Sequence, residues 1–183
     1  MELSDFTFTL LDKQTALHHF DCEDADINEF LQQDALNYQL QRIANTYLFL
    51  ENNGEIVAFF SISNDCLNDL GADKGYTNTI WNRLHRKIFL PNDKRIRQYP
   101  AIKIGRLGVS KSYQKNGLAY QLMDFIKGWT LYDHGPGCRL LLLDAYNKER
   151  QIKYYQRNGF NLLLDEDACD RTRIMYFDLL RLQ

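Results

Sequence analysis

The sequence lacks the features that mark several classes of protein. Its four cysteines (Cys22, Cys66, Cys138 and Cys169) are scattered, and none of them forms a CxxC pair. The four histidines show no metal-site spacing with these cysteines, so we expect no bound metal. No apolar run approaches the ~20 residues that a helix needs to span a bilayer, so we expect no membrane association.

A leader and a strong charge are lacking as well. The N-terminal stretch MELSDFTFTL has neither the basic start nor the long apolar segment of a secretory leader. Scattered cysteines without a leader predict reduced thiols in the cytoplasm. The formal net charge of −2 gives no global basic field for nucleic acid or a membrane surface. The 183 residues are long enough for one core, which predicts a single domain over residues 1–183.

Hydrophobic patterns predict alternating strands and helices along the chain. A hairpin is the clearest local signal, because two apolar strands, 46–50 and 56–63, flank the turn Asn-Asn-Gly-Glu. The remaining strands are expected at 6–11, 101–109, 138–146, 161–165 and 173–180, and the helices at 20–43, at 81–89 and within 147–160, where the helix is expected to stop at Gly159. Residues 112–129 are expected to start as a polar loop and to continue as an amphipathic helix. In the helix at 20–43, Ile27, Phe30, Leu31, Leu36 and Leu40 can share one apolar face. This order predicts an α/β fold in which a mixed sheet carries helices on both faces.

A glycine-bearing loop, Gln114-Lys115-Asn116-Gly117, comes where the helix at 112–129 begins. Backbone N–H groups at a helix start are unpaired, and the helix dipole favours an anion there. Gly108 lies in the strand just before this loop. A glycine inside a strand indicates a bulge, a ligand against the backbone or room for a neighbouring aromatic ring, and the sequence leaves these alternatives open.

Two motifs in this region resemble those of a known family. Arg106–Val109 followed by Tyr113–Ala119 resembles the acetyl-CoA motif Q/R-x-x-G-x-G/A of the Gcn5-related N-acetyltransferases. The later stretch KYYQRNGF, residues 153–160, resembles the family signature F-Y-x-x-x-G-F, and one buried strand separates the two motifs. The resemblance implies an acetyl-CoA-dependent N-acetyltransferase built on a mostly antiparallel sheet.

The resemblance also implies how acetyl-CoA is held. Backbone N–H groups of 114–119 would wrap the pyrophosphate, with Gln114 bracing the loop, and strand 107–109 would pair with the pantetheine after splaying from strand 138–145. A backbone N–H near Val109 would polarise the thioester carbonyl. The implied cofactor-binding residues are Leu107, Gly108, Val109, Gln114, Lys115, Asn116, Gly117, Leu118, Ala119 and Asn147.

The family's general-acid tyrosine matches Tyr155, which would protonate the departing thiolate. From the residues alone, a core aromatic beside Tyr154 is the favoured interpretation of Tyr155, and the acid role comes from the resemblance. The general base is not identified by the pattern. Asp144 and Glu51 are candidates, and a chain of water molecules is the alternative.

The resemblance implies an amine acceptor, and the N-terminal half is similar to one branch of the family. The stretch FDCEDADINEFLQQDALNYQ and the strand pattern G-R-L-x-V resemble the toxins that acetylate aminoacyl-tRNA. Basic residues that suit RNA phosphates, or form a solvated face, are Arg83, Arg86, Lys87, Lys94, Arg95 and Arg97. The partners implied are tRNA, a small antitoxin protein and a second copy of the chain. The alternatives are acetylation of a small-molecule or protein amine, or a degenerate cofactor-binding module.

Overall fold

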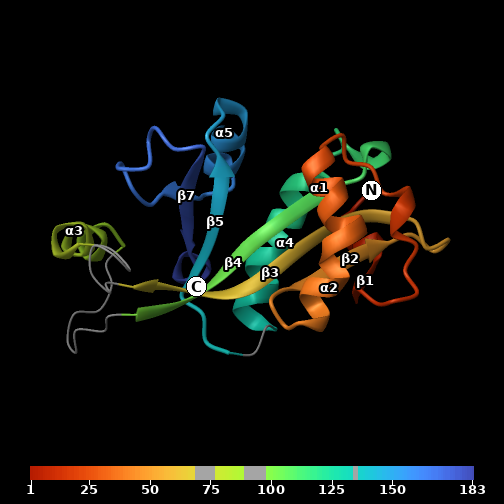
Figure 1. Cartoon of the computed structure of the whole chain (residues 1–183), viewed down its shortest axis with the longest axis horizontal. Coiled ribbons are helices and arrows are strands. Elements are labelled where there is room, and N and C mark those ends of the chain that lie inside the picture. Colours follow the sequence, from red (N-terminus) through yellow and green to blue (C-terminus); the bar gives the residue numbers. More distant parts are fainter. Residues whose placement is uncertain (69–76, 89–97, 134–135) are drawn as a thin grey trace. The chain divides into compact units, whose positions relative to one another are not determined.

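A computed structural model describes residues 1–68, 77–88, 98–133 and 136–183 (Figure 1). The chain divides into two compact units. The first contains residues 1–63 and 104–129, and the second contains residues 64–103 and 130–183. Two long strands, β3 (Ile56–Asn68) and β4 (Gln98–Val109), contribute residues to both units.

In the first unit the strand order is β1 (Thr7–Leu10), β2 (Asn45–Leu50), β3 and β4. β2 is antiparallel to both β1 and β3. The β2–β3 turn is closed by the Gly54 N–H, which donates to the Glu51 carbonyl at 2.9 Å, and Gly54 has a φ of +84°. The antiparallel pairing and this turn confirm the predicted hairpin. Gly54 supplies the left-handed conformation that the turn requires.

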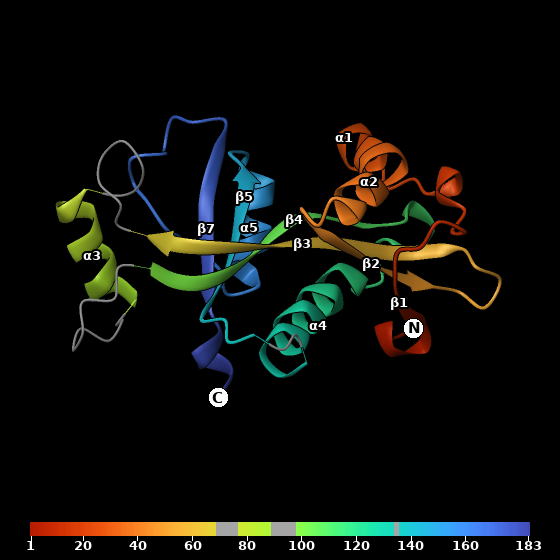
Figure 2. The same cartoon turned by 60° about the horizontal axis from the view of Figure 1, so that its bottom comes forward.

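Helices cover both faces of the sheet in this unit (Figure 2). Leu48 and Phe59 point to the face that carries α1 (Ala25–Glu29) and α2 (Ala35–Leu40). On the opposite face Phe49 and Phe60 meet Phe125 and Trp129 of α4 (Leu118–Tyr132), with ring centroids 5.0 and 5.9 Å apart. Alternate residues of the strands therefore pack against helices on opposite faces of the sheet. The prediction that helices cover both faces is confirmed in this unit.

The predicted helix over 20–43 is shorter and interrupted. It begins at Ala25, where the Asp24 carboxylate accepts hydrogen bonds from the N–H groups of Asp26 and Ile27. A π-helical turn, Phe30–Asp34, then separates α1 from α2. Leu40 is 60% exposed, so the prediction that it shares the buried face with Leu31 is wrong. The π turn adds a residue to one turn of the helix and so rotates the side chains that follow it. A face derived from regular helical spacing therefore no longer holds at residue 40.

In the second unit the strand order is β4, β5 (Leu140–Tyr146), β7 (Thr172–Asp178) and β6 (Asn161–Leu162). β7 is antiparallel to both β5 and β6. Leu140–Leu143 are buried, as predicted for a nearly all-apolar strand. The helices here are α3 (Asn78–Ile88) and α5 (Glu149–Arg157). α5 ends as predicted, with Gly159 at a φ of +83° just beyond the helix.

Several boundaries differ from the sequence prediction. The strand expected at 161–165 has only two residues, and the strand expected at 173–180 gives way to a 3-10 helix after Asp178, whose carboxylate accepts from the Leu180 N–H. The short 3-10 helices are Leu3–Asp5, Leu17–His19, Lys111–Tyr113 and Leu179–Leu182. The α/β class and the mostly antiparallel sheet are confirmed. None of the helices in the described ranges has the length and apolar content to cross a bilayer.

Candidate active site

The loop between β4 and α4 has an unusual backbone conformation. Both Lys115 and Gly117 are left-handed, with φ of +66° and +79°. A Cβ added at Gly117 would meet no atom within 4 Å. The backbone conformation, rather than crowding by neighbouring atoms, therefore favours glycine here, and the space in front of the loop stays open.

This loop presents unpaired backbone donors. The N–H groups of Tyr120 and Gln121 already bond to the Gly117 carbonyl. Within the described ranges, the N–H groups of Lys115, Asn116, Gly117 and Leu118 donate to no protein acceptor. These donors lie at the start of a 15-residue helix, whose dipole favours negative charge. The arrangement fits a phosphate group, because the donors face open space and the helix start favours an anion. A side chain at position 117 would project into the space that the anion needs.

Gln114 braces the loop from behind. Its Nε2 donates to the carbonyl oxygens of Cys22 and Val109, both at 3.0 Å. One amide therefore joins the end of β4 to the segment that precedes α1. This is the bracing position that the family resemblance assigned to Gln114.

A second brace, which the sequence did not reveal, centres on Asp21. Its carboxylate lies 2.9 Å from the Lys111 Nζ and accepts a 2.9 Å hydrogen bond from the Asn28 Nδ2. The Asn28 Oδ1 in turn accepts from the Cys22 N–H at 2.9 Å. Hydrogen bonds from the Glu23 N–H, Lys111 and Asn28 lower the pKa of Asp21 to about 2. The ionised carboxylate thus holds the chain just before α1 against the segment that leads into the loop between β4 and α4.

Gly108 is accounted for by packing. A Cβ there would lie 3.1 Å from Ile27 Cγ2, 3.1 Å from a Phe59 ring carbon and 3.2 Å from a Phe20 ring carbon. Of the alternatives left open by the sequence, room for a neighbouring aromatic ring is the one that the structure supports. The pairing of Leu107–Val109 with pantetheine remains a prediction about the backbone of this strand.

Tyr155 lies on α5 in the second unit and is half-buried. Its ring centroid is 5.1 Å from that of Tyr154 and 6.0 Å from that of Phe160. In the described part of the chain its hydroxyl has no hydrogen-bond partner, and burial raises its pKa to about 12. The ring is therefore packed as a core aromatic, while the hydroxyl stays protonated and available as a donor.

Asn147, also in the second unit, is exposed and ties a nearby turn. Its Nδ2 donates to the carbonyls of Ala168 and Asp170, both at 3.0 Å. These bonds use the amide donors within the protein, and the cofactor contact of Asn147 remains a prediction. The two candidate bases have partners as well. Glu51 accepts from the Tyr113 hydroxyl at 3.4 Å, and Asp144 lies 2.6 Å from the Lys103 Nζ.

The predicted basic surface is partly engaged with the protein. Arg83 pairs with Glu166 at 2.7 Å, and the Lys87 Nζ donates to the Leu162 carbonyl at 2.7 Å. Arg86 is exposed and has no partner among the described residues. The other predicted members, Lys94, Arg95 and Arg97, lie outside the described residues.

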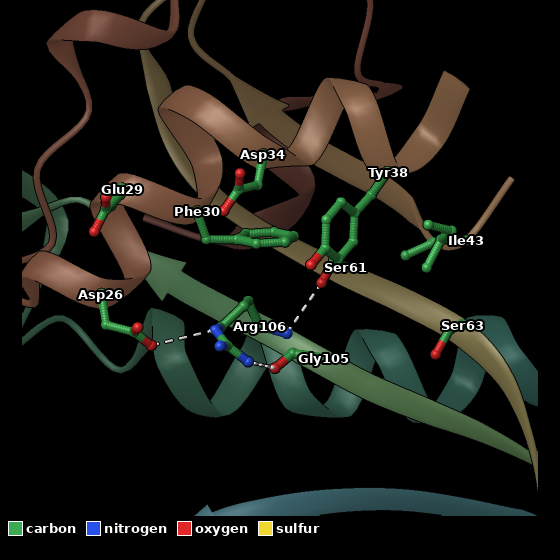
Figure 3. A pocket seen from close by; sticks show the side chains of 11 residues that line it. Asp26, Glu29, Phe30, Asp34, Tyr38, Ile43, Ser61, Ser63, Gly105 and Arg106 are labelled. Atoms are coloured by element: carbon green, nitrogen blue, oxygen red, sulfur yellow. Dashed lines mark hydrogen bonds and ion pairs between the residues drawn. The ribbon is translucent and has the colours of Figure 1, made fainter. Parts of the chain in front are cut away.

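The first unit also contains a cavity of about 240 Å³ that the sequence analysis did not predict (Figure 3). It lies between the helical segment 25–40 and strands β3 and β4. Its lining residues are Asp26, Glu29, Phe30, Asp34, Tyr38, Ile43, Ala44, Ser61, Ser63, Gly105 and Arg106. The sequence did contain a signal for one wall of this cavity. Residues 26, 30, 34 and 38 recur at intervals of four, a spacing that brings side chains to one side of a helix. In the described part of the chain no cluster of His, Cys, Asp and Glu is arranged to hold a metal ion.

Comparison with known proteins gives matches over nearly the whole chain. The family model of the acetyltransferase (GNAT) domain matches residues 44–162. Among solved structures, AtaT complexed with acetyl-methionyl-tRNAfMet is 19% identical, with a TM-score of 0.70 and 97% of each chain covered. AtaTR bound with AcCoA is 20% identical, with a TM-score of 0.70, and the match covers 98% of this chain and 96% of that one. A mutant AtaT toxin bound to the C-terminus of the antitoxin AtaR is 18% identical, with a TM-score of 0.66 and coverages of 97% and 94%.

Proposed function

The chain belongs to the GNAT acetyltransferase family, and from this premise we propose that it transfers the acetyl group of acetyl-CoA to a primary amine. The observation that supports acetyl-CoA most directly is the loop at the start of α4. Four backbone N–H groups without protein acceptors in the described ranges, beside an open Gly117, suit a pyrophosphate. Leu118 and Ala119 continue this surface into the first turn of the helix.

When bound, acetyl-CoA would supply an activated acetyl group as a thioester. Transfer to the amine nitrogen would form a C–N bond and break the C–S bond; the nitrogen would lose a proton to water or to one of the candidate carboxylates, and the departing thiolate would gain a proton. Leu107–Val109 would hold the pantetheine along β4, with a backbone N–H near Val109 directed at the carbonyl oxygen. Tyr155 would give the proton, because its raised pKa of about 12 keeps the hydroxyl protonated at neutral pH.

Thermal unfolding with and without acetyl-CoA tests the cofactor site. We expect the cofactor to raise the Tm of the wild-type chain by mass action. The variant Gly117→Glu should lose this response, because a carboxylate would occupy the space meant for phosphate. Gly54→Glu is a matched control, since Gly54 is also left-handed with nothing within 4 Å of an added Cβ. A wild-type chain that shows no shift at millimolar acetyl-CoA would sink the proposal.

Aminoacyl-tRNA is the acceptor that the likeness to the AtaT complex favours. The test is transfer of labelled acetyl from acetyl-CoA to charged tRNA, beside a panel of small amines. If α3 contacts tRNA phosphates, Arg86→Glu should lower the activity on tRNA and leave any activity on small amines unchanged. Transfer confined to the small amines, unaffected by this reversal, rejects the tRNA acceptor and leaves a small-amine acetyltransferase.

A small antitoxin protein is the partner that the AtaT–AtaR complex favours. Co-purification with the product of a small neighbouring gene tests this proposal, with acetyl transfer measured in the presence and absence of that product. We also propose a homodimer, and sedimentation of the purified chain tests it directly.

A further inference from the structure

The cavity in the first unit combines aromatic walls with an acidic rim (Figure 3). The rings of Phe30 and Tyr38 lie 5.7 Å apart and nearly perpendicular, at 88°. Ile43 and Ala44 add apolar surface on the same side. Two aromatic rings set at right angles offer a face and an edge, which suits a ligand that is part apolar and part cationic.

Three carboxylates line this cavity, from Asp26, Glu29 and Asp34, against one guanidinium, from Arg106. Neither Glu29 nor Asp34 has a cation partner among the described residues. The π-helical turn includes both Phe30 and Asp34, and such turns are frequent at functional sites. The excess of negative charge favours a cationic ligand over an anionic one.

The protein already places one organic cation against this wall. The Arg106 guanidinium lies 5.7 Å from the centre of the Phe30 ring, and its Nε lies 3.4 Å from an oxygen of Asp26. That Nε is buried and makes no hydrogen bond, while the Nη1 donates only to the neighbouring Gly105 carbonyl. The guanidinium therefore leaves a buried donor without a hydrogen bond at this wall, and a better-matched cation would compete with it.

A buried hydroxyl in the cavity lining also has unused hydrogen-bonding capacity. Ser61 is only 1% exposed, and its Oγ accepts the Arg106 N–H at 3.0 Å. Its hydroxyl hydrogen finds no acceptor in the described part of the chain, and its oxygen keeps a second lone pair. A buried hydroxyl with unused hydrogen-bonding capacity indicates that a polar atom of a ligand bonds to it here.

We propose that this cavity binds the ammonium group of the acceptor, carried on an apolar stem, and that Arg106 is the internal cation with which it competes. This inference rests on the proposed acetyl transfer. Gly105 and Arg106 directly precede Leu107–Val109 on β4, so the ammonium end would enter beside the strand proposed for pantetheine. Before transfer the ammonium would give up one proton to water, and the nitrogen would lose a second as the amide forms, matched by the proton that the thiolate gains. The neutral amide would lose the attraction of the carboxylates and leave the cavity.

An ammonium on an apolar stem could belong to a free small amine or to the aminoacyl end of tRNA. Methionine methyl ester represents the second source and 1,4-diaminobutane the first. N-acetylmethionine methyl ester is the uncharged control. NMR-monitored titration of the wild-type chain without acetyl-CoA should show binding of at least one charged probe, about tenfold tighter than the acetylated ester. Binding of the ester alone favours the aminoacyl source, and binding of the diamine alone favours the free amine.

Variants of the lining residues test the contacts. The double variant Glu29→Gln with Asp34→Asn should raise the Kd of the charged probe about three- to tenfold. Glu55→Gln, which changes an exposed carboxylate elsewhere in this unit, should leave the Kd unchanged. Tyr38→Leu should raise the Kd about threefold, and Tyr38→Phe should leave it unchanged. Arg106→Gln should lower the Kd, because the competing guanidinium is gone.

Three results would overturn the inference: no binding of either charged probe at millimolar concentration, equal losses in the Glu55→Gln control, or weaker binding after Arg106→Gln. The acetyl-CoA thermal shift, measured on the same preparation, reports separately on the proposed function. If acetyl-CoA raises the Tm of the chain but neither charged probe binds, only the cavity proposal is refuted.

Discussion

The loop at 114–117, proposed to hold the cofactor, and the helix that carries Tyr155 are built in opposite ways. In the loop, the groups that would meet the ligand belong to the backbone, and side chains such as Gln114 and Asp21 hold it from behind. On α5, one phenolic oxygen would do the chemistry, and aromatic packing holds its ring. The affinity of a backbone site for its ligand should fall in steps as the bracing side chains are removed. The turnover that depends on one phenolic oxygen should instead be lost when that oxygen is removed.

Tyr155→Phe is the variant with the largest expected effect. It removes one oxygen and keeps the ring contacts with Tyr154 and Phe160. Without the proton donor, we expect the turnover number to fall by roughly 10²–10⁴, with the affinity for acetyl-CoA nearly unchanged. Steady-state kinetics with calorimetric binding of acetyl-CoA separates the two quantities.

Tyr154→Phe is the control, because it removes the neighbouring hydroxyl from the same helix. A loss of only a few-fold in Tyr155→Phe would move the acid role to water or another residue. A wild-type chain that binds acetyl-CoA but transfers no acetyl group to any amine would indicate a degenerate cofactor-binding module.

Gln114→Ala tests the stepwise behaviour of the loop. It removes two part-buried hydrogen bonds at about 1 kcal/mol each, so we expect the Kd for acetyl-CoA to rise roughly 10- to 30-fold. The turnover number at saturating cofactor should change little, because Tyr155 is untouched. Gln156→Ala, at an exposed position on α5, is the control for loss of a glutamine amide. A collapse in turnover with an unchanged Kd would contradict the view that Gln114 acts only as a brace.

Local patterns in the sequence were enough for the hairpin, for the apolar β5 and for the end of α5 at Gly159, because each depends on residues close together in the chain. The same holds for the backbone conformation of the loop at 114–117, which Gly117 marks. The Asp21 brace was out of reach, since 90 residues separate Asp21 from Lys111. The sequence named the reason for Gly108 among several alternatives but could not choose it, because Phe20 and Phe59 come from distant segments.

The acidic cavity was missed for a related reason. Its charged rim comes from one helical segment, but its floor comes from β3 and β4, where Ser61 and Arg106 meet. The π turn also changes which side chains share a face, so a regular helical register placed Leu40 with the buried residues although it is exposed. Tertiary contacts, rather than local propensity, decide such sites.

Asp21→Asn is the variant with the smallest expected effect and the finest test of the braced loop. Because the folded-state pKa of Asp21 is about 2, against an ordinary value of 3.8, the unfolded chain binds more protons between these two values. The carboxylate therefore adds stability above pH ~4, and this contribution is lost as the pH falls through about 2. We expect Asp21→Asn to flatten the acid side of the Tm–pH curve and to raise the Kd for acetyl-CoA only about twofold at pH 7, since this exposed ion pair is weak. Asp133→Asn, at an exposed aspartate without a partner in the described ranges, should change neither quantity. An acid limb identical to that of the wild type would show that the Asp21 contacts do not hold the loop in solution.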